Sequence, residues 1–257
     1  VSPRYAMEIK EPYFAHGLDP IVRRNDFKLC GILNGIDDTG YNPQFDTHIF
    51  ANYTPDDMSN KAVNKAELQK MLNLPVRAET PVISMISRLV SHKGFDLVLN
   101  IIEELLQSDV QFIVLGTGDS HYEGFFKDLA RRYPDKMSAQ IMFNNDLSRK
   151  IYAGSDIFLM PSKSEPCGLS QMIACRYATI PIVRETGGLY DSIKPLYNGY
   201  TFANYNAHDM LYVIREAVED YKNKEVWSQL MYRAATSDFS WKNSAKQYEA
   251  LYLSMLK

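Results

Sequence analysis

Short runs of apolar and β-branched residues alternate with amphipathic segments from Pro81 onward. The runs that predict strands are 82–86, 111–115, 140–143, 157–160 and 180–183, with a weaker one at 200–202. Between the first two runs, apolar residues recur every three or four positions over 95–107, which predicts an amphipathic helix. Strands joined through helices at this spacing run parallel, so the pattern predicts an α/β fold with a doubly wound, Rossmann-like parallel sheet.

The two ends of the chain do not show this alternation of predicted strands and helices. The first 80 residues are rich in proline and polar side chains, and only 61–72 firmly predicts a helix there. After Ala207 the chain is helical, and 244–256 carries an apolar stripe. The stripe consists of Tyr248, Leu251, Tyr252 and Met255. It indicates a helix that covers a neighbouring core, either the main sheet or another domain.

Composition and charge exclude several classes of protein. With 257 residues, 46% apolar and 23% charged, the chain can build a core, which excludes a low-complexity or disordered protein. No apolar run approaches the roughly 20 residues that cross a bilayer, so we expect a soluble chain with no membrane partner. The 28 Lys and Arg against 31 Asp and Glu give a net charge of -3, so no nucleic-acid partner is expected.

The cysteines and histidines predict neither disulfides nor a metal site. Cys30, Cys167 and Cys175 show no C-x-x-C spacing, and the five histidines show no ligand spacing. A reducing cytoplasm is the expected setting. The chain begins Val1-Ser2-Pro3, without an initiator Met or a signal peptide, and we interpret it as a piece of a longer polypeptide.

Polar residues and glycines follow the predicted strands, where a doubly wound sheet binds its ligand. They include the cations Arg88 and Lys93, the carboxylate Glu165, and glycine turns at 116–118 and 187–188. Helix N-termini expose backbone N–H groups and partial positive charge, so the starts at 167–169 and 187–188 each predict a phosphate cradle. A diphosphate with an attached polar group is the ligand that these residues favour.

The charged residues suggest specific roles at this edge. No D-x-D triplet is present to hold a metal, so Arg88 and Lys93 are expected to neutralise a departing diphosphate. Glu165 lies in a turn fixed by prolines and glycine, where it can accept hydrogen bonds from sugar hydroxyls or stabilise positive charge at an anomeric carbon. A salt bridge that orients Lys93 or Lys163 is the alternative role for Glu165.

Other phosphate and catalytic motifs fit less well. The Gly116-Thr117-Gly118 turn lacks the third glycine of a dinucleotide fingerprint, because His121 stands there, and no P-loop motif is present. Ser170 follows no G-x-S-x-G pattern, so a hydrolase nucleophile is not expected. Phe143 is positioned to stack on a base, although an aromatic residue at a strand end also serves as core.

Several motifs resemble one family along nearly the whole chain. They are S-R-L with K-G at 87–94, L-G-T-G-D at 115–119, P-S with E-P-C-G-L at 161–169, and T-G-G-L at 186–189. Further matches are V-S-P-R-Y at 1–5, L-N-G-I-D at 33–37 and D-F-S-W at 238–241. Together they resemble the C-terminal half of the ADP-glucose-dependent bacterial glycogen synthases and plant starch synthases.

The resemblance implies a GT-B glycosyltransferase, whose two Rossmann-like domains enclose the active site. Such an enzyme transfers glucose with retention from ADP-glucose to the non-reducing end of an α-1,4-glucan, without a cofactor or metal. Arg88 and Lys93 would bind the donor diphosphate, and Glu165 would contact the glucosyl group. The remaining substrate-binding residues would be Asn34, Gly116, Gly118, Asp119, Phe143, Asn144, Ser162, Cys167, Gly168, Leu169, Ser170, Thr186, Gly187 and Gly188. Among them, Phe143 and Asn144 fall in the adenine pocket.

The resemblance also divides the chain. Residues 1–35 would be the remnant of an interdomain segment, 36–240 the nucleotide-sugar-binding domain, and 241–257 a helix that packs toward an N-terminal domain missing here. That domain carries a Lys-x-Gly-Gly-Leu donor loop and an active-site histidine, so we expect this fragment to fold and bind ADP weakly but not to elongate glucan. The compartment would be the cytoplasm, or the plastid stroma in a plant.

Two alternatives remain open from the sequence. One is another retaining GT-B glycosyltransferase that uses a UDP- or GDP-sugar. The other is a noncatalytic module that binds a nucleotide or glucan.

Overall fold

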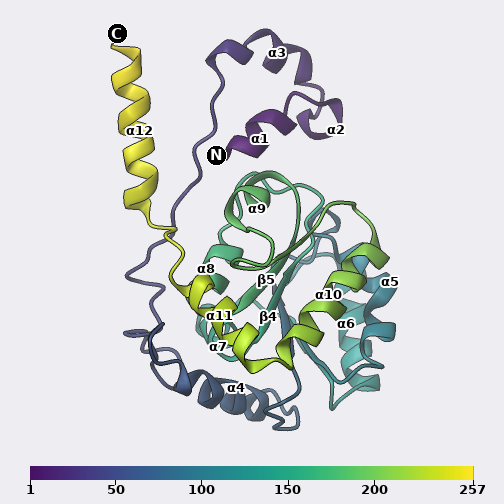
Figure 1. Cartoon of the computed structure of the whole chain (residues 1–257). Helices are drawn as coiled ribbons and strands as arrows, with labels where there is room; N and C mark the ends of the chain where they lie inside the picture. The colour runs from purple at the N-terminus through teal and green to yellow at the C-terminus, as the bar shows by residue number, and fades with distance from the viewer. Residues whose placement is uncertain (257) are drawn as a thin grey trace.

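The computed structural model describes residues 1–256, and these contain a six-stranded parallel sheet in the order β3-β2-β1-β4-β5-β6 (Figure 1). The strands are β1 (Val82–Ile86), β2 (Gln111–Leu115), β3 (Met137–Gln140), β4 (Ile157–Met160), β5 (Ile180–Arg184) and β6 (Tyr200–Phe202). The chain winds outward from β1 to β3 and returns to place β4 beside β1. The predicted doubly wound α/β sheet is confirmed, and its crevice for ligands lies between the loops after β1 and β4.

Helices cover both faces because the strands alternate apolar side chains between two cores. Ile83 and Met85 face the larger core with α5 (Phe95–Leu105), whereas Val82 faces a second core with α4 (Ser59–Met71). The other flanking helices are α6 (Ser120–Arg132), α7 (Asn145–Gly154), α8 (Ser170–Arg176), α9 (Gly187–Ser192), α10 (Ala207–Tyr221) and α11 (Lys224–Ala235). The arrangement puts a rigid, buried sheet under the candidate site.

One predicted strand is misplaced. The segment 140–143 is not a strand, because β3 ends at Gln140, which lies opposite Leu115 of β2. β3 is an edge strand with polar Ser138 and Gln140, so its apolar pattern is weak. Phe143 therefore lies beyond the sheet and is 93% exposed, which excludes the interpretation of Phe143 as core.

The N-terminal segment is more helical than the sequence pattern predicts. It forms α1 (Pro3–Glu8), α2 (Pro12–Ala15), α3 (Asp19–Arg24) and a 3₁₀ helix, η1 (Asp26–Lys28). A proline occupies the first or second position of each α-helix, where its fixed φ suits helix initiation. Three of the prolines that suggest a linker, Pro3, Pro12 and Pro20, therefore lie at helix starts. Helix α1 lies beside α9 (Figure 1).

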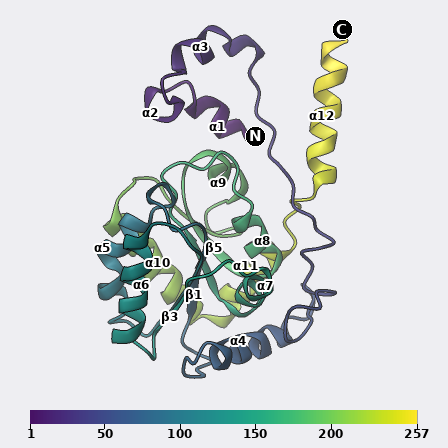
Figure 2. The same cartoon turned by 180° about the vertical axis from the view of Figure 1, so that it is seen from behind.

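The chain enters and leaves the sheet domain at one crossing. The Ile36 amide donates to the Phe239 carbonyl at 2.8 Å, and Ser244 Oγ donates to the Leu33 carbonyl at 2.7 Å. From this crossing α12 (Trp241–Met255) projects away from the sheet (Figure 2). Its predicted stripe covers no part of the sheet, and Met255 is 74% exposed.

Two further observations concern the end of the chain and the length of its helices. Residue 257, the last of the predicted C-terminal segment, lies outside the described residues. Across residues 1–256, every helix is too short or too polar to traverse a lipid bilayer.

Candidate functional site

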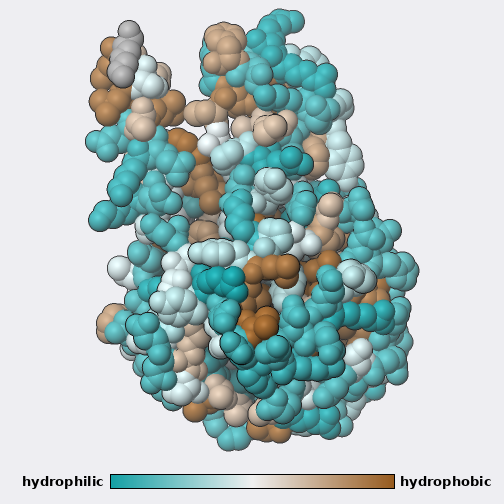
Figure 3. All heavy atoms as spheres, viewed as in Figure 1, coloured by the Kyte–Doolittle hydropathy of each residue, from teal (hydrophilic) through white to brown (hydrophobic). Residues whose placement is uncertain are grey.

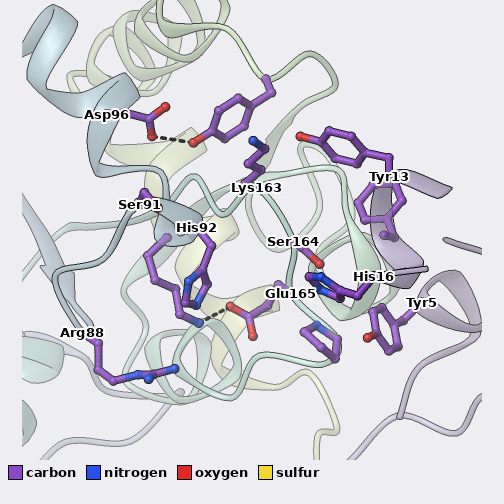
Figure 4. Close-up of a pocket in the computed structure, with 14 residues that line it drawn as sticks. Tyr5, Tyr13, His16, Arg88, Ser91, His92, Asp96, Lys163, Ser164 and Glu165 are labelled. Carbon is purple, nitrogen blue, oxygen red and sulfur yellow. Dashed lines mark hydrogen bonds and ion pairs between the residues drawn. The ribbon is translucent and has the colours of Figure 1, made fainter. Parts of the chain in front are cut away.

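A cavity of about 720 Å³ opens at the carboxyl ends of β1 and β4. The loop after β1 brings Arg88 and the 3₁₀ helix η2 (Ser91–Lys93), and the loop after β4 brings Glu165 (Figure 4). The three residues predicted to be catalytic therefore line one cavity, as the strand-end argument requires.

Glu165 and Lys93 form an ion pair in this cavity. Lys93 Nζ lies 2.6 Å from Glu165 Oε2, and Ser162 Oγ donates to the same oxygen at 3.3 Å. The alternative role of Glu165 as a salt-bridge partner of Lys93 is thus present in the structure. Glu165 Oε1 accepts no hydrogen bond from residues 1–256, which leaves one carboxylate oxygen for a sugar hydroxyl.

Arg88 links two cavities. Its side chain is exposed and has no carboxylate within 4.0 Å in the described part of the chain. Besides the larger cavity it lines a smaller one of about 210 Å³, together with Gly116, Phe143 and Asn144. An unpaired guanidinium between the smaller, mostly apolar cavity and the Lys93–Glu165 pair suits an anion with a flat group at one end.

The Gly116-Thr117-Gly118 turn serves mainly to support Arg88. A Cβ on Gly116 would lie 1.8 Å from the Ser87 carbonyl oxygen, and one on Gly118 would lie 2.2 Å from that of Leu89. The turn also pairs with the Arg88 loop, since the Leu89 amide donates to the Thr117 carbonyl at 2.9 Å. Of the predicted binding residues here, Gly116 lines the smaller cavity, whereas Gly118 and Asp119 line neither.

The segment before α8 has backbone N–H groups that are free to bind a ligand. The N–H groups of residues 167–170 donate to no acceptor within residues 1–256, and Gly168 takes the left-handed φ of +71°. Cys167 is buried, and burial raises the pKa of its thiol while a hydrogen bond from the Asn34 backbone opposes that rise. The structure thus brings Asn34 beside Cys167, and the free amides follow Glu165 directly.

The cradle predicted at Thr186, Gly187 and Gly188 is filled by the protein itself. Both Glu8 carboxylate oxygens accept from the Gly187 amide at 3.0 Å, and the Gly188 amide donates to the Glu165 carbonyl at 3.0 Å. Thr186 is fully buried under this contact. In the structure Thr186 and Gly187 thus hold the Glu8 carboxylate, and Gly188 holds the Glu165 carbonyl. Phosphate binding at these three residues stays a prediction.

Asn144 likewise has an internal role, because its side chain caps α7. Its Oδ1 accepts from the Leu147 amide at 2.9 Å. A capping side chain satisfies an N–H group at the start of the helix. Asn144 still lines the smaller cavity.

Several lining residues escaped the sequence prediction. From the N-terminal helices come Tyr5, Tyr13, Phe14 and His16, and from the sheet domain His92, Asp96, Lys163 and Tyr205 (Figure 4). Burial, with Lys93 and Arg88 nearby, lowers the pKa of His92, which favours the neutral imidazole. The sequence suggested Lys163 only as an alternative ion-pair partner of Glu165, and the N-terminal aromatic residues carry no signal of a site.

The site shows no metal cluster of its own. Within residues 1–256, no three His, Cys, Asp or Glu side chains gather as ligands for a metal ion would. The charged side chains that line the cavity are Arg88, Lys93, Asp96, Lys163 and Glu165.

A doubly wound sheet with this arrangement of cations is typical of nucleotide-dependent transferases, and comparison with known proteins defines the family. The chain belongs to the glycosyl transferases group 1 family, whose model matches residues 69–233. It is 52% identical to a glycogen synthase of Clostridium acetobutylicum and 49% identical to one of Bacillus cereus, over 100% of this chain and 55% of each relative. The chain therefore spans about half the length of these relatives.

Solved structures support the same family. The catalytic domain of starch synthase IV from Arabidopsis thaliana, bound to ADP and acarbose, matches with a TM-score of 0.92 and 36% identity, over 99% of this chain and 54% of that one. A sucrose-phosphate synthase from Thermosynechococcus elongatus matches with a TM-score of 0.65 and 19% identity, over 96% of this chain and 57% of that one, and shows the fold alone. The sequence-based resemblance to glycogen and starch synthases, and the GT-B-like fold, are confirmed.

Proposed function

We propose that this chain is the nucleotide-sugar-binding half of a retaining glucosyltransferase that moves glucose from ADP-glucose to the non-reducing end of an α-1,4-glucan. The observation that carries the proposal is the position of Arg88, an unpaired cation between the smaller cavity and the Lys93–Glu165 pair. Relatives that match the entire chain are glycogen synthases, and the matching starch synthase has ADP and acarbose bound.

The geometry suggests how the donor binds. The base occupies the smaller cavity beside Phe143, and the diphosphate spans Arg88 and Lys93. The glucosyl group then reaches Glu165 Oε1 and the free amides of residues 167–170. This order places cations at the phosphates and a carboxylate at the sugar.

The same groups explain how the reaction is assisted. As the bond from the sugar to the diphosphate breaks, negative charge grows on the phosphate oxygens and positive charge on the anomeric carbon. Arg88 and Lys93 stabilise the departing diphosphate, since fixed charges aimed at developing charge lower the barrier without reorganisation. The Glu165 carboxylate lies near the proposed position of the anomeric carbon, where it stabilises the positive charge that develops there.

Binding of ADP and UDP to Arg88→Ala tests this proposal. We expect calorimetry to show that the wild-type chain binds ADP better than UDP, and that Arg88→Ala weakens ADP binding by about tenfold or more, since a charged hydrogen bond contributes about 1.5–3 kcal/mol. Arg24→Ala at the exposed end of α3 is the matched control, and it should bind as the wild type does.

Three outcomes would contradict parts of the proposal. Tighter binding of UDP would indicate a different sugar donor. Unchanged ADP binding by Arg88→Ala would remove that residue from the site. Binding of neither nucleotide would show that this chain does not form the nucleotide site.

A further inference from the structure

Helix α1 is fastened directly to the loop that carries Glu165. Ser2 Oγ donates to the Pro166 carbonyl at 2.7 Å. Two residues later, the Arg4 amide donates to Asp191 Oδ2 of α9 at 2.8 Å. These bonds hold the N-terminal helix against the side of the cavity where we place the sugar.

The Glu8 carboxylate makes the largest number of these contacts. Its oxygens accept from the Gly187 amide, at 3.0 Å each, and from Thr186 Oγ1 at 3.1 and 3.2 Å. Glu8 is only 6% exposed, and Arg4 Nε at 3.3 Å is the cation that balances its charge. A charge buried this deeply is costly unless its partners are fixed, so α1 and the Thr186–Gly187 turn are locked together.

The turn that Glu8 holds also supports the backbone of Glu165. The Gly188 amide donates to the Glu165 carbonyl at 3.0 Å. A Cβ on Gly187 would lie 1.9 Å from that carbonyl oxygen, which shows how closely the turn packs on it. Any shift of the turn therefore displaces the main chain of Glu165.

The loop that carries Arg88, on the side of the site where we place the diphosphate, is not held by the N-terminal helix. Arg88 is carried by the loop after β1, which pairs with the Gly116–Gly118 turn. Among the described residues, no hydrogen bond runs from residues 1–8 to that loop or to the smaller cavity. The two parts of the site thus have separate supports.

We propose that Glu8 is a positioning residue for the sugar side of the site. Its carboxylate, through Thr186 and Gly187, sets the backbone of Glu165 so that the free carboxylate oxygen faces the glucosyl group. The seating of α1 and the orientation of Glu165 are thereby coupled. The inference rests on the proposed function, because it assigns Glu8 to the glucosyl part of the donor.

The test compares two ligands that differ only in the glucosyl group. Calorimetry measures the Kd of ADP and of ADP-glucose for the wild-type chain, Glu8→Gln and Glu11→Gln. We expect Glu8→Gln to weaken ADP-glucose binding by about fivefold or more while ADP binding stays within about twofold. Glu11 is exposed and lies outside these contacts, so Glu11→Gln should change neither Kd.

A second pair of variants approaches the contact from its other side, and remains informative if Glu8→Gln fails to fold. Thr186→Val removes the hydroxyl donor at nearly constant shape, whereas Thr186→Ser keeps it. We expect Thr186→Val to weaken ADP-glucose selectively and Thr186→Ser to bind as the wild type does. If Thr186 served stability alone, its substitution would weaken the binding of ADP and of ADP-glucose equally.

The inference would be overturned, while the proposed function stands, by either of two results. One is an equal loss of affinity for ADP and ADP-glucose, and the other is an unchanged Kd for both ligands in the Glu8 and Thr186 variants. Failure of the wild-type chain to bind ADP would instead overturn the proposed function, and the inference would fall with it. The wild-type titration with ADP therefore separates the two failures.

Discussion

At the residue scale, Gly116 shows that a glycine in a predicted binding site can be required by the protein backbone. Its φ is +155°, and the Ser87 carbonyl oxygen occupies the space where a Cβ would point. The close approach positions the loop that carries Arg88. Gly124, in the exposed part of α6, offers the opposite case, because a Cβ there meets no atom within 4 Å.

Alanine at these two glycines should therefore change the free energy of unfolding in opposite directions. Gly116→Ala must push the Arg88 loop away, and we expect it to lower the free energy of unfolding by about 1–3 kcal/mol and to weaken ADP binding. Gly124→Ala should raise the free energy of unfolding by roughly 0.5–1 kcal/mol, because glycine is a poor helix former. Urea denaturation measures both, and equal stability of the two variants would contradict the steric argument.

The candidate site could be predicted for residues whose chemistry is local. Arg88, Lys93 and Glu165 follow predicted strands, and the topology of a parallel sheet brings such residues together. Glu8 could not be found this way, since its partners lie 178 and 179 positions later in the sequence. In this structure the Gly187 amide, which the sequence predicts to bind a phosphate, binds the Glu8 carboxylate.

At the element scale, buried polar side chains hold α4 in addition to Leu68, which packs in the second apolar core. Lys61 Nζ donates to the carbonyls of Ala153 at 3.1 Å and Tyr177 at 2.9 Å, and to Thr179 Oγ1 at 2.9 Å. One turn further, Lys65 Nζ lies 2.7 Å from Asp156 Oδ2. These contacts fasten α4 to the sheet domain.

The burial of Lys61 predicts a pH dependence of stability. Burial lowers the pKa of Lys61 from 10.5 to about 7. Between those values the unfolded chain binds a proton that the folded chain does not, so this residue makes stability rise with pH, by up to about 1.4 kcal/mol per pH unit. We expect urea denaturation from pH 7 to 9 to show this rise in the wild type.

Two variants isolate the contribution of Lys61 to that slope. Lys61→Met should reduce the slope, because it removes the titrating amine. Lys70→Met, at an exposed position of the same helix, should keep it. The prediction fails if all three proteins show the same slope.

Elements were predictable where burial imposed a clear period, and less so elsewhere. The apolar face of α5 and the buried strands β1 and β2 match the pattern closely. β3 at the sheet edge was shifted because polar residues interrupt it. The N-terminal helices were missed since each is at most six residues long, too short to show a helical period.

At the scale of the whole molecule, exposed apolar side chains lie on the two ends of the chain as well as on the sheet domain. Hydrophobic residues lie at the free end of α12, where Leu253 is 56% and Met255 74% exposed, and on the segment from α1 to η1, where Phe27 is 83% exposed (Figure 3). The chain also spans about half of its curated relatives. Both observations favour a function that needs the remaining part of such a relative, and we infer that the chain alone transfers no glucose.

A chimera tests this inference together with the proposed reaction. The chain replaces the segment that it matches in the Clostridium acetobutylicum glycogen synthase, with which it shares 52% identity. We expect the chimera to extend a maltooligosaccharide with glucose from ADP-glucose, and the isolated chain to show no transfer under the same conditions. Transfer by the isolated chain would show that its own cavity is a complete active site.

The chimera also allows the charged residues to be assayed during turnover. Lys93→Ala should lower kcat by about 100-fold or more, because a preorganised charge at the departing diphosphate is lost and Glu165 loses its partner. Lys127→Ala, on the exposed side of α6, is the control and should keep the kcat of the chimera. An active chimera in which both substitutions have equal effects would mean that Lys93 only orients Glu165 or the surrounding loop, and that leaving-group stabilisation must come from Arg88 or from the grafted half.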